Sequence, residues 1–198
     1  IVSIAALVLM QHDDRHNELT PEETNAGWLL LFDGSSTKGW HNFKAESVRP
    51  GWVVRDGALV CVADLHPGDI VTDQEFDWFE LTLEFKLEKD QNSGIVIRAT
   101  NEGQTMWQSG PEIQLYDHPA EEGVEISGYL YQLYKSETDV QKPAGEWNRL
   151  RVLISPTICK TELNGVFYYQ FVWGSEDFWS RVKKSKFSKY PYFAKAER

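Results

Sequence analysis

The sequence predicts an all-β sandwich with one or two short helices. From Trp28 onward, short runs rich in Val, Ile, Leu, Phe, Tyr and Trp are separated by turn-forming residues. The turn-forming stretches are D-G-S-S (33–36), R-P-G (49–51), D-G (56–57), H-P-G-D (66–69) and N-G (164–165). Many short strands punctuated in this way are typical of a β-sandwich.

Size and charge limit the partners of the chain. Its 198 residues, with a mass of 22.8 kDa, fit one domain with a sizeable core, which we expect to span residues 20–198. Thirty acidic residues against twenty basic ones give a net charge of -10, which repels a phosphate backbone and argues against nucleic acid as a partner. An aromatic content of 13% suits a carbohydrate ligand, although packing in the core explains the same rings.

The N-terminal residues differ in character from the rest. I-V-S-I-A-A-L-V-L-M (1–10) is an apolar run that is too short to span a bilayer, and polar residues follow at once. It resembles the apolar part of a secretory signal whose basic start is missing. Residues 1–19 are therefore expected to be a residual signal-like or flexible segment, and the protein to be secreted or periplasmic, in a bacterial cell envelope, with no integral membrane span. A buried or domain-swapped strand is the alternative interpretation of the run.

Capping residues predict the helices. Thr20, followed by Pro21 and Glu23, forms a capping-box signature. The run S-E-D-F-W-S-R-V-K-K-S (175–185) offers Ser175 as a cap, acidic residues in its first turn and lysines in its last turn. We expect a short helix after Thr20 and a surface helix over one end of the sandwich.

Period-two alternation and turn pairs predict the strands. The clearest strand is E-L-T-L-E-F-K-L-E (80–88), which has one apolar and one polar face. Asp56-Gly57 is a type I′ turn pair that predicts a hairpin over 52–62, and Asn164-Gly165 predicts a second hairpin. Further strands are expected at 93–100, 111–117, 128–134, 147–155, 158–163 and 166–172.

The two cysteines, Cys61 and Cys159, lie in separate strand-like runs. No zinc-type spacing is present. We expect two buried free thiols, and a disulfide between neighbouring strands is the alternative.

Polar side chains interrupt the apolar pattern most clearly in P-E-I-Q-L-Y-D-H (111–118). Alternation places Glu112, Gln114 and Tyr116 on one face of a strand. A carboxylate and an amide about 7 Å apart can hold two sugar hydroxyls or share a metal ion. Asp117 and His118 follow at the strand end, where loops often place reactive groups. A solvated outer face would give the same alternation.

Other polar residues lie on neighbouring segments. Arg98 is expected to share a strand face with Gly94, from which it could pair with Glu112 or Gln114 across the ladder. An ordinary cross-strand salt bridge is the alternative. Asn92 and Gly94 fit either close approach of a ligand or a turn and bulge entering the strand.

Two further residues could reach a ligand from segments later in the chain. Tyr131, in the run 128–134, could supply a phenol, although core packing explains most tyrosines there. Lys142 lies in the loop K-P-A-G-E-W-N (142–148), whose proline, glycine and tryptophan fit a turn and packing.

Several motifs, in order, resemble the 3-keto-disaccharide hydrolase family. N-S-G-I-x-x-R is found at 92–98 and G-x-E-x-Q-x-x-D at 110–117. The resemblance also includes G-W-L-L-L-F-D-G-S-S-T-K-G-W (27–40), K-P-A-G-E-W-N (142–148), L-N-G (163–165) and F-W-S-R-V-K-K-S-K-F (178–187). Similar proteins continue with a closing strand after the late helix, so we expect this sandwich to lack that strand.

The resemblance implies a fold and a chemistry. The fold would be a concanavalin A-like jelly roll of two antiparallel sheets, whose concave face binds an oligosaccharide or other glycoside. The reaction would act on sugars oxidised at C3, where a base removes the C2 proton, the C1 substituent is eliminated and water can later add. A divalent metal ion would be the one cofactor, with Glu112, Gln114 and Asp117 as candidate ligands.

The residue roles follow from these expectations. Glu112 would be the base or a metal ligand, Arg98 would orient the keto sugar, and Asp117 would support the catalytic site. Substrate contacts are expected from Asn92, Gln114, His118, Tyr131 and Lys142. The alternatives are a non-catalytic carbohydrate-binding module and an ordinary glycosidase, which would need a second carboxyl roughly 5–10 Å from the first.

Overall fold

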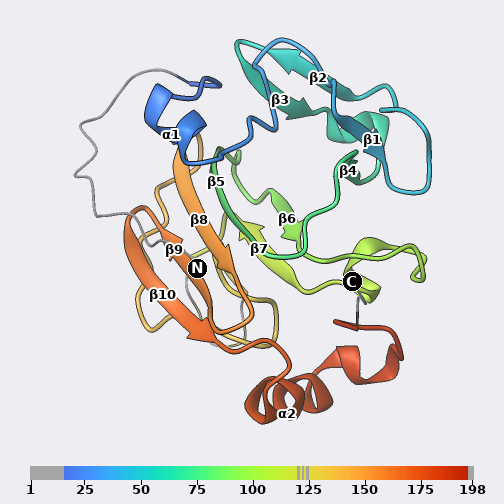
Figure 1. Ribbon diagram of the computed structural model, residues 1–198, viewed down its shortest axis with the longest axis vertical. Coiled ribbons are helices and arrows are strands. Elements are labelled where there is room, and N and C mark those ends of the chain that lie inside the picture. Colours follow the sequence, from blue (N-terminus) through green and yellow to red (C-terminus); the bar gives the residue numbers. More distant parts are fainter. Residues whose placement is uncertain (1–15, 120, 122, 124, 196–198) are drawn as a thin grey trace. The chain divides into compact units, whose positions relative to one another are not determined.

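The computed structural model describes residues 16–119, 121, 123 and 125–195, and the chain forms two compact units (Figure 1). We refer to residues 1–74 as unit 1 and to residues 75–198 as unit 2. The single domain predicted for 20–198 stays a prediction. Most of the predicted signal-like segment 1–19 lies outside the described residues, so secretion also stays a prediction.

Unit 1 combines a short helix with two small antiparallel pairs. Helix α1 (Pro21–Asn25) begins with the predicted capping box, in which the Glu23 amide donates to the Thr20 hydroxyl and the Thr20 amide donates to the Glu23 carboxylate. Strand β1 (Trp40–Asn42) pairs with β4 (Ile70–Thr72), and a 3-10 turn, η1 (Ala63–Leu65), precedes β4.

The first predicted hairpin is confirmed in unit 1. Strand β2 (Trp52–Arg55) pairs with β3 (Ala58–Cys61). Asp56 and Gly57 have φ values of 51° and 73°, the left-handed backbone that a type I′ turn requires.

The first layer of unit 2 is a four-stranded antiparallel sheet among the described residues, in the order β10-β9-β8-β5 (Figure 1). Its strands are β5 (Phe79–Phe85), β8 (Asn148–Ile154), β9 (Cys159–Leu163) and β10 (Val166–Phe171). Leu83, on the predicted apolar face of β5, lies opposite Leu150 in the β5–β8 ladder. Asn164 and Gly165, with φ values of 50° and 79°, form the second predicted hairpin turn.

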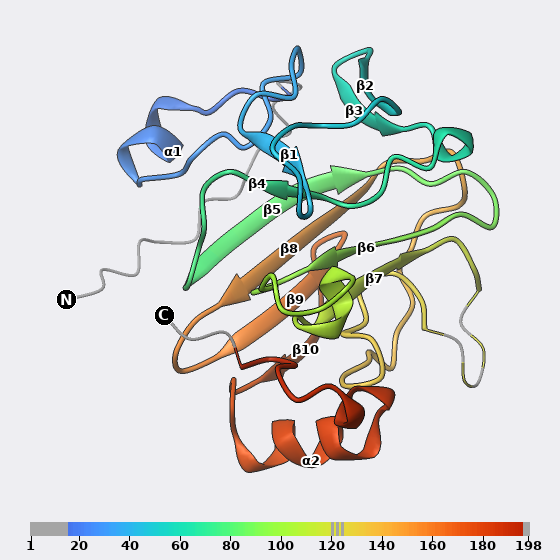
Figure 2. The ribbon, with the colours of Figure 1, turned by 90° about the vertical axis from the view of Figure 1, so that its right-hand side faces the viewer.

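The second layer of unit 2 is built on β6 (Asn92–Val96) and β7 (Glu112–Tyr116), which run antiparallel (Figure 2). A 3-10 turn, η2 (Met106–Gln108), lies between them in sequence. The segment 128–134 follows β7 through hydrogen bonds such as Tyr131 N to Glu112 O at 2.9 Å. The strand predicted for 128–134 is wrong, because Gln132 has a φ of 58° and the chain turns back to bridge Leu130 with Tyr134.

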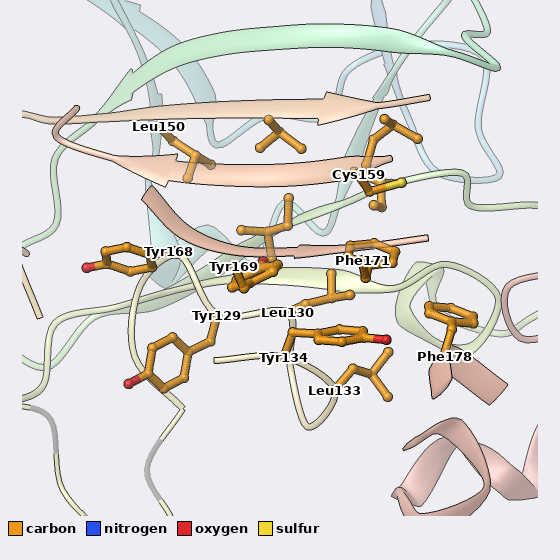
Figure 3. Packing of buried hydrophobic residues seen from close by; sticks show 14 of the residues in the cluster. Tyr129, Leu130, Leu133, Tyr134, Leu150, Cys159, Tyr168, Tyr169, Phe171 and Phe178 are labelled. Carbon is orange, nitrogen blue, oxygen red and sulfur yellow. The ribbon is translucent and has the colours of Figure 1, made fainter. Parts of the chain in front are cut away.

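The two layers enclose one core. Ile113 and Leu115 of β7 are 1% and 4% exposed and pack in a cluster with Leu150 and with Phe171. Figure 3 shows Leu150, Cys159, Tyr169 and Phe171 facing Leu130 and Tyr134. The predicted all-β fold, a jelly-roll sandwich of antiparallel sheets with few helices, is confirmed.

A helical segment closes the described part of unit 2. Helix α2 (Glu176–Lys184) begins at Ser175, whose hydroxyl accepts from the Phe178 amide as predicted, and a 3-10 turn, η3 (Lys186–Lys189), follows. Phe178 is fully buried against the rings of Phe171 and Trp173, with centroids 5.6 Å and 5.4 Å away. Among the described residues, no helix is long and apolar enough to cross a membrane.

Both cysteines are free, as predicted. Cys159 is buried, whereas Cys61 is exposed at the end of β3. The expectation of burial was therefore wrong for Cys61, because this short β-hairpin leaves the end of the strand facing solvent.

Replacing Phe178 with Ala is expected to lower the free energy of unfolding by about 3–5 kcal/mol, because the change leaves a cavity among stacked rings. Phe167→Ala is the matched control: its ring is 51% exposed on β10, so the same deletion should change stability by about 0.5 kcal/mol or less. Urea unfolding followed by tryptophan fluorescence measures both. Equal losses would contradict the placement of α2.

Candidate functional site

The polar face of β7 is partly covered in the folded protein. Ile113 and Leu115 point into the core, so Glu112, Gln114 and Tyr116 point to the other side, as predicted. Gln114 is only 3% exposed and Glu112 is half-buried. A fully solvated outer face, the alternative interpretation, does not fit this burial.

Gly94 makes room for the carboxylate of Glu112. A Cβ atom added at Gly94 would lie 2.7 Å from Cδ of Glu112, well inside van der Waals contact. Strand β6 keeps a regular register through this glycine, with Gly94 opposite Gln114. The turn-and-bulge alternative is therefore wrong for Gly94. The glycine is needed here because a side chain lies across its backbone.

A lysine and a tyrosine lie beside this carboxylate. The Lys186 ammonium of η3 is 4.1 Å from the ring centroid of Tyr131 and 4.8 Å from that of Trp107. The pKa of the Tyr131 phenol is raised by burial first, and then by the negative charges of Glu125 and Glu112.

A second carboxyl, that of Glu125, joins the group. Burial raises its pKa, although a hydrogen bond from the backbone of Gln132 and the charges of Lys135 and Lys186 act in the opposite direction. Burial lowers the pKa of Lys186, against the favourable charges of Glu112 and Glu125.

We refer to Glu112, Glu125, Tyr131 and Lys186 as the polar cluster. Glu125, Tyr131 and Lys186 have shifted pKa values, and titratable groups of this kind that gather in one place are a signature of functional sites. The sequence singled out Glu112 and Tyr131 but missed the other two. Lys186 falls within the late motif F-W-S-R-V-K-K-S-K-F, which was the available signal, whereas no pattern marked Glu125.

The observed position and contacts of Arg98 differ from the predicted ones. It follows the end of β6 with a φ of 52°, so strand alternation does not apply and it does not share the face of Gly94. Its guanidinium forms an ion pair with Asp77 at 3.0 Å and lies 4.5 Å and 4.8 Å from the ring centroids of Trp78 and Trp173. The side chain is 7% exposed. This environment fits a packing role at the sandwich core.

Three predicted residues gather at the far end of the β6–β7 pair. Asn92 lies opposite Tyr116, and the His118 ring stacks on Tyr116 with centroids 5.3 Å apart. Asp117 Oδ2 accepts from the Asp90 amide at 3.0 Å, and this bond holds the turn that precedes β6. Tyr116 is the fourth residue after Glu112 along β7, a distance of roughly 13 Å.

Lys142 lies near the four-stranded sheet. Its amide donates to Asn148 Oδ1 at 2.8 Å, at the start of β8. The same oxygen accepts from the amide group of Asn164, in the turn between β9 and β10. The backbone of Lys142 is thus hydrogen-bonded to the β8–β10 region.

The three predicted metal ligands do not form one site. Glu112 and Asp117 lie at opposite ends of β7, and Asp117 is engaged by the Asp90 backbone. Within the described ranges, no group of three or more His, Cys, Asp and Glu side chains is placed to hold a metal ion. The prediction that Glu112, Gln114 and Asp117 together bind one metal ion is therefore wrong. A role for a divalent ion stays a prediction.

Comparisons with known proteins agree with the motifs. A family model described as a 3-keto-alpha-glucoside-1,2-lyase-like domain matches residues 27–190, which include the whole polar cluster. A 3-keto-disaccharide hydrolase from Bacteroides thetaiotaomicron is 28% identical over 152 residues, covering 65% of this chain and 52% of that protein. The chain thus spans about half the length of this curated relative.

Solved structures support the fold. A Parabacteroides distasonis protein, provisionally called a glycosyl hydrolase, matches with a TM-score of 0.78 and 32% identity, over 89% of this chain and 86% of that one. A second protein from that organism, described in the same way, has a TM-score of 0.52 and 22% identity, over 69% and 61% of the two chains. The second match concerns the fold alone.

Replacing Glu125 with Gln is expected to raise the free energy of unfolding at neutral pH. The pKa of this carboxyl is raised above 4.5 in the folded state, so its charge destabilises the fold wherever the folded carboxyl is ionised. The gain should disappear as the pH falls below 4.5, where both states are protonated.

Urea unfolding at pH 7 and pH 4 measures this difference. Glu137→Gln, at an exposed position, is the control and should change stability by about 0.5 kcal/mol or less. A Glu125→Gln variant that is less stable than wild type at pH 7 would contradict the burial of this carboxyl.

Proposed function

Because this chain belongs to the family of 3-keto-alpha-glucoside-1,2-lyase-like domains, we propose that it cleaves glycosides whose sugar carries a ketone at C3. The observation that best supports this activity is the placement of Glu112. Its carboxylate lies over Gly94, is half-buried, and has the Tyr131 phenol and the Lys186 ammonium nearby. A fixed base beside hydrogen-bond donors is what removal of a proton next to a carbonyl requires.

Glu112 is the proposed base. The ketone at C3 acidifies the proton at C2, and the carboxylate takes this proton while negative charge develops on O3. The electron pair on O3 then re-forms the C3 carbonyl as the C1–O bond breaks, and the aglycone leaves with the electrons of that bond. Addition of water to the unsaturated sugar completes a net hydrolysis.

The rest of the β6–β7 face is the proposed sugar-binding surface. Gln114 is adjacent to Glu112 on this face and offers both an amide donor and a carbonyl acceptor. At the far end, Asn92 and the stacked rings of Tyr116 and His118 offer a polar and an aromatic contact for a second sugar or an aglycone.

The pair Glu112 and Glu125 supports a second candidate, an ordinary glycosidase. Both carboxyl charges act on Tyr131 and Lys186, so the two groups share one region. Burial raises the pKa of Glu125, as expected of a general acid. This enzyme would cleave a glucoside without a ketone, which separates the two candidates.

Aglycone release from a 3-keto-glucoside and from the matching unoxidised glucoside tests the proposal. We expect release from the keto substrate alone. Glu112→Gln should lower kcat by about 10²–10⁴-fold, because an amide cannot accept the C2 proton. Glu146→Gln, at an exposed position in a loop of unit 2, is the matched control and should keep the wild-type rate.

The other outcomes distinguish the alternatives. Release from the unoxidised substrate would favour the two-carboxylate glycosidase. Binding without release from either substrate would favour a carbohydrate-binding module. The same assay with EDTA tests the predicted metal ion. A rate that falls with EDTA and returns with a divalent ion would support the cofactor prediction, and an unchanged rate would contradict it.

Gly94→Ala should lower kcat on the keto substrate by about 10²-fold, because the new methyl group displaces the Glu112 carboxylate. The variant should remain folded, since the side chain of Glu112 can move. Ser93→Ala, at the exposed neighbouring position on β6, is the control and should leave kcat unchanged. Equal activity of Gly94→Ala and wild type would show that the observed position of Glu112 is not needed.

A further inference from the structure

Lys186 is held in place by its neighbours in unit 2. Its ammonium lies within 4.1–5.2 Å of the ring centroids of Tyr131, Trp107 and Phe187. Its backbone amide donates to Gln132 Oε1 at 3.0 Å. The next residue, Phe187, is 1% exposed and stacks on Phe193 at 4.2 Å, so the backbone on that side is anchored in the core. The position of the charge is therefore organised before any ligand binds.

The N–H donors of this ammonium remain available. Across residues 16–119, 121, 123 and 125–195, Lys186 Nζ has ring faces as neighbours and forms no hydrogen bond or ion pair. Glu112 and Glu125 are near enough for their charges to favour the protonated lysine. The donors of the Lys186 ammonium are therefore available to an oxygen atom of a ligand.

We propose that Lys186 is a catalytic residue whose ammonium binds O3 of the keto sugar as that oxygen becomes negative. This role rests on the proposed function. Glu112 takes the C2 proton, the C–H electron pair forms the C2–C3 double bond, and the carbonyl π pair moves to O3, where the ammonium N–H groups donate. The O3 pair then reforms the carbonyl, the double bond shifts to C1–C2, and the C1–O pair leaves with the aglycone, which takes up a proton.

Lys186 suits this role better than Arg98, the cation that the sequence indicated. Arg98 is committed to Asp77 and to two tryptophan rings. An ammonium among ring faces keeps its hydrogen-bond donors, because cation–π contacts engage the charge and not the donors. A fixed, partly desolvated cation stabilises a developing oxyanion more strongly than solvent does.

The same surroundings predict a pH dependence. The charged and titratable groups around Lys186 are Glu112 of β7, Glu125 and Tyr131 of the neighbouring segment, and Lys189 of η3. Burial lowers the pKa of Lys186, and Lys189 adds to this effect, while both carboxylates oppose it. Activity that needs the protonated lysine is lost as the pH rises through this lowered pKa, whereas Tyr131, whose pKa is raised, stays neutral there.

The test measures kcat and KM for a nitrophenyl 3-keto-glucoside across pH in wild type, Lys186→Met and Lys186→Arg. We expect kcat of Lys186→Met to fall by about 10²–10³-fold, with a smaller change in KM, as for other oxyanion donors. Lys186→Arg should recover part of kcat and lose the alkaline fall in rate, because arginine stays charged. Lys183→Met, exposed on α2, is the matched control.

The outcomes separate this inference from the proposed function. An inactive wild type would overturn the function itself. An active wild type with an equally active Lys186→Met would overturn the role of Lys186 alone. If Lys186→Met does not fold, as judged by circular dichroism, the dependence of kcat on pH in Lys186→Arg decides. The same fall in kcat at alkaline pH as in wild type would overturn the role of Lys186. Loss of that fall would support it.

Discussion

Burial of Ile113 and Leu115 is the constraint on which the site depends. These side chains fill the core between the two layers of unit 2, so the intervening residues of β7 must point the other way. A slip of one residue would place Glu112 and Gln114 in the core, where an unpaired charge and amide are costly. Packing on one face thus fixes the position of the proposed base on the other.

Local patterns predicted most of the fold. The turn pairs Asp56-Gly57 and Asn164-Gly165 and the caps at Thr20 and Ser175 depend on a few adjacent residues, and all of them are confirmed. The strand expected at 128–134 was wrong. Gln132 takes a left-handed backbone there, a conformation that a non-glycine residue adopts only when surrounding contacts require it.

The site was predictable only in part, because some of its residues are placed by contacts between distant segments and not by local patterns. Alternation found Glu112, because its neighbours on β7 are apolar. It failed for Arg98, whose positive φ ends the alternation, and it could not find Lys186 or Glu125. Lys186 comes near Glu112 because η3 packs on Tyr131, and Glu125 does so because the segment before Leu130 is hydrogen-bonded to β7. Such contacts between distant segments leave no periodic signal.

In the proposed mechanism, the reaction begins with removal of the C2 proton. The most direct measurement compares aglycone release from a 3-keto-glucoside carrying hydrogen or deuterium at C2, with enzyme in excess so that product release does not limit the rate. Slower release from the deuterated substrate is the predicted result, because the C2–H bond breaks in the step for which Glu112 is placed. Equal rates under these conditions would contradict the claim.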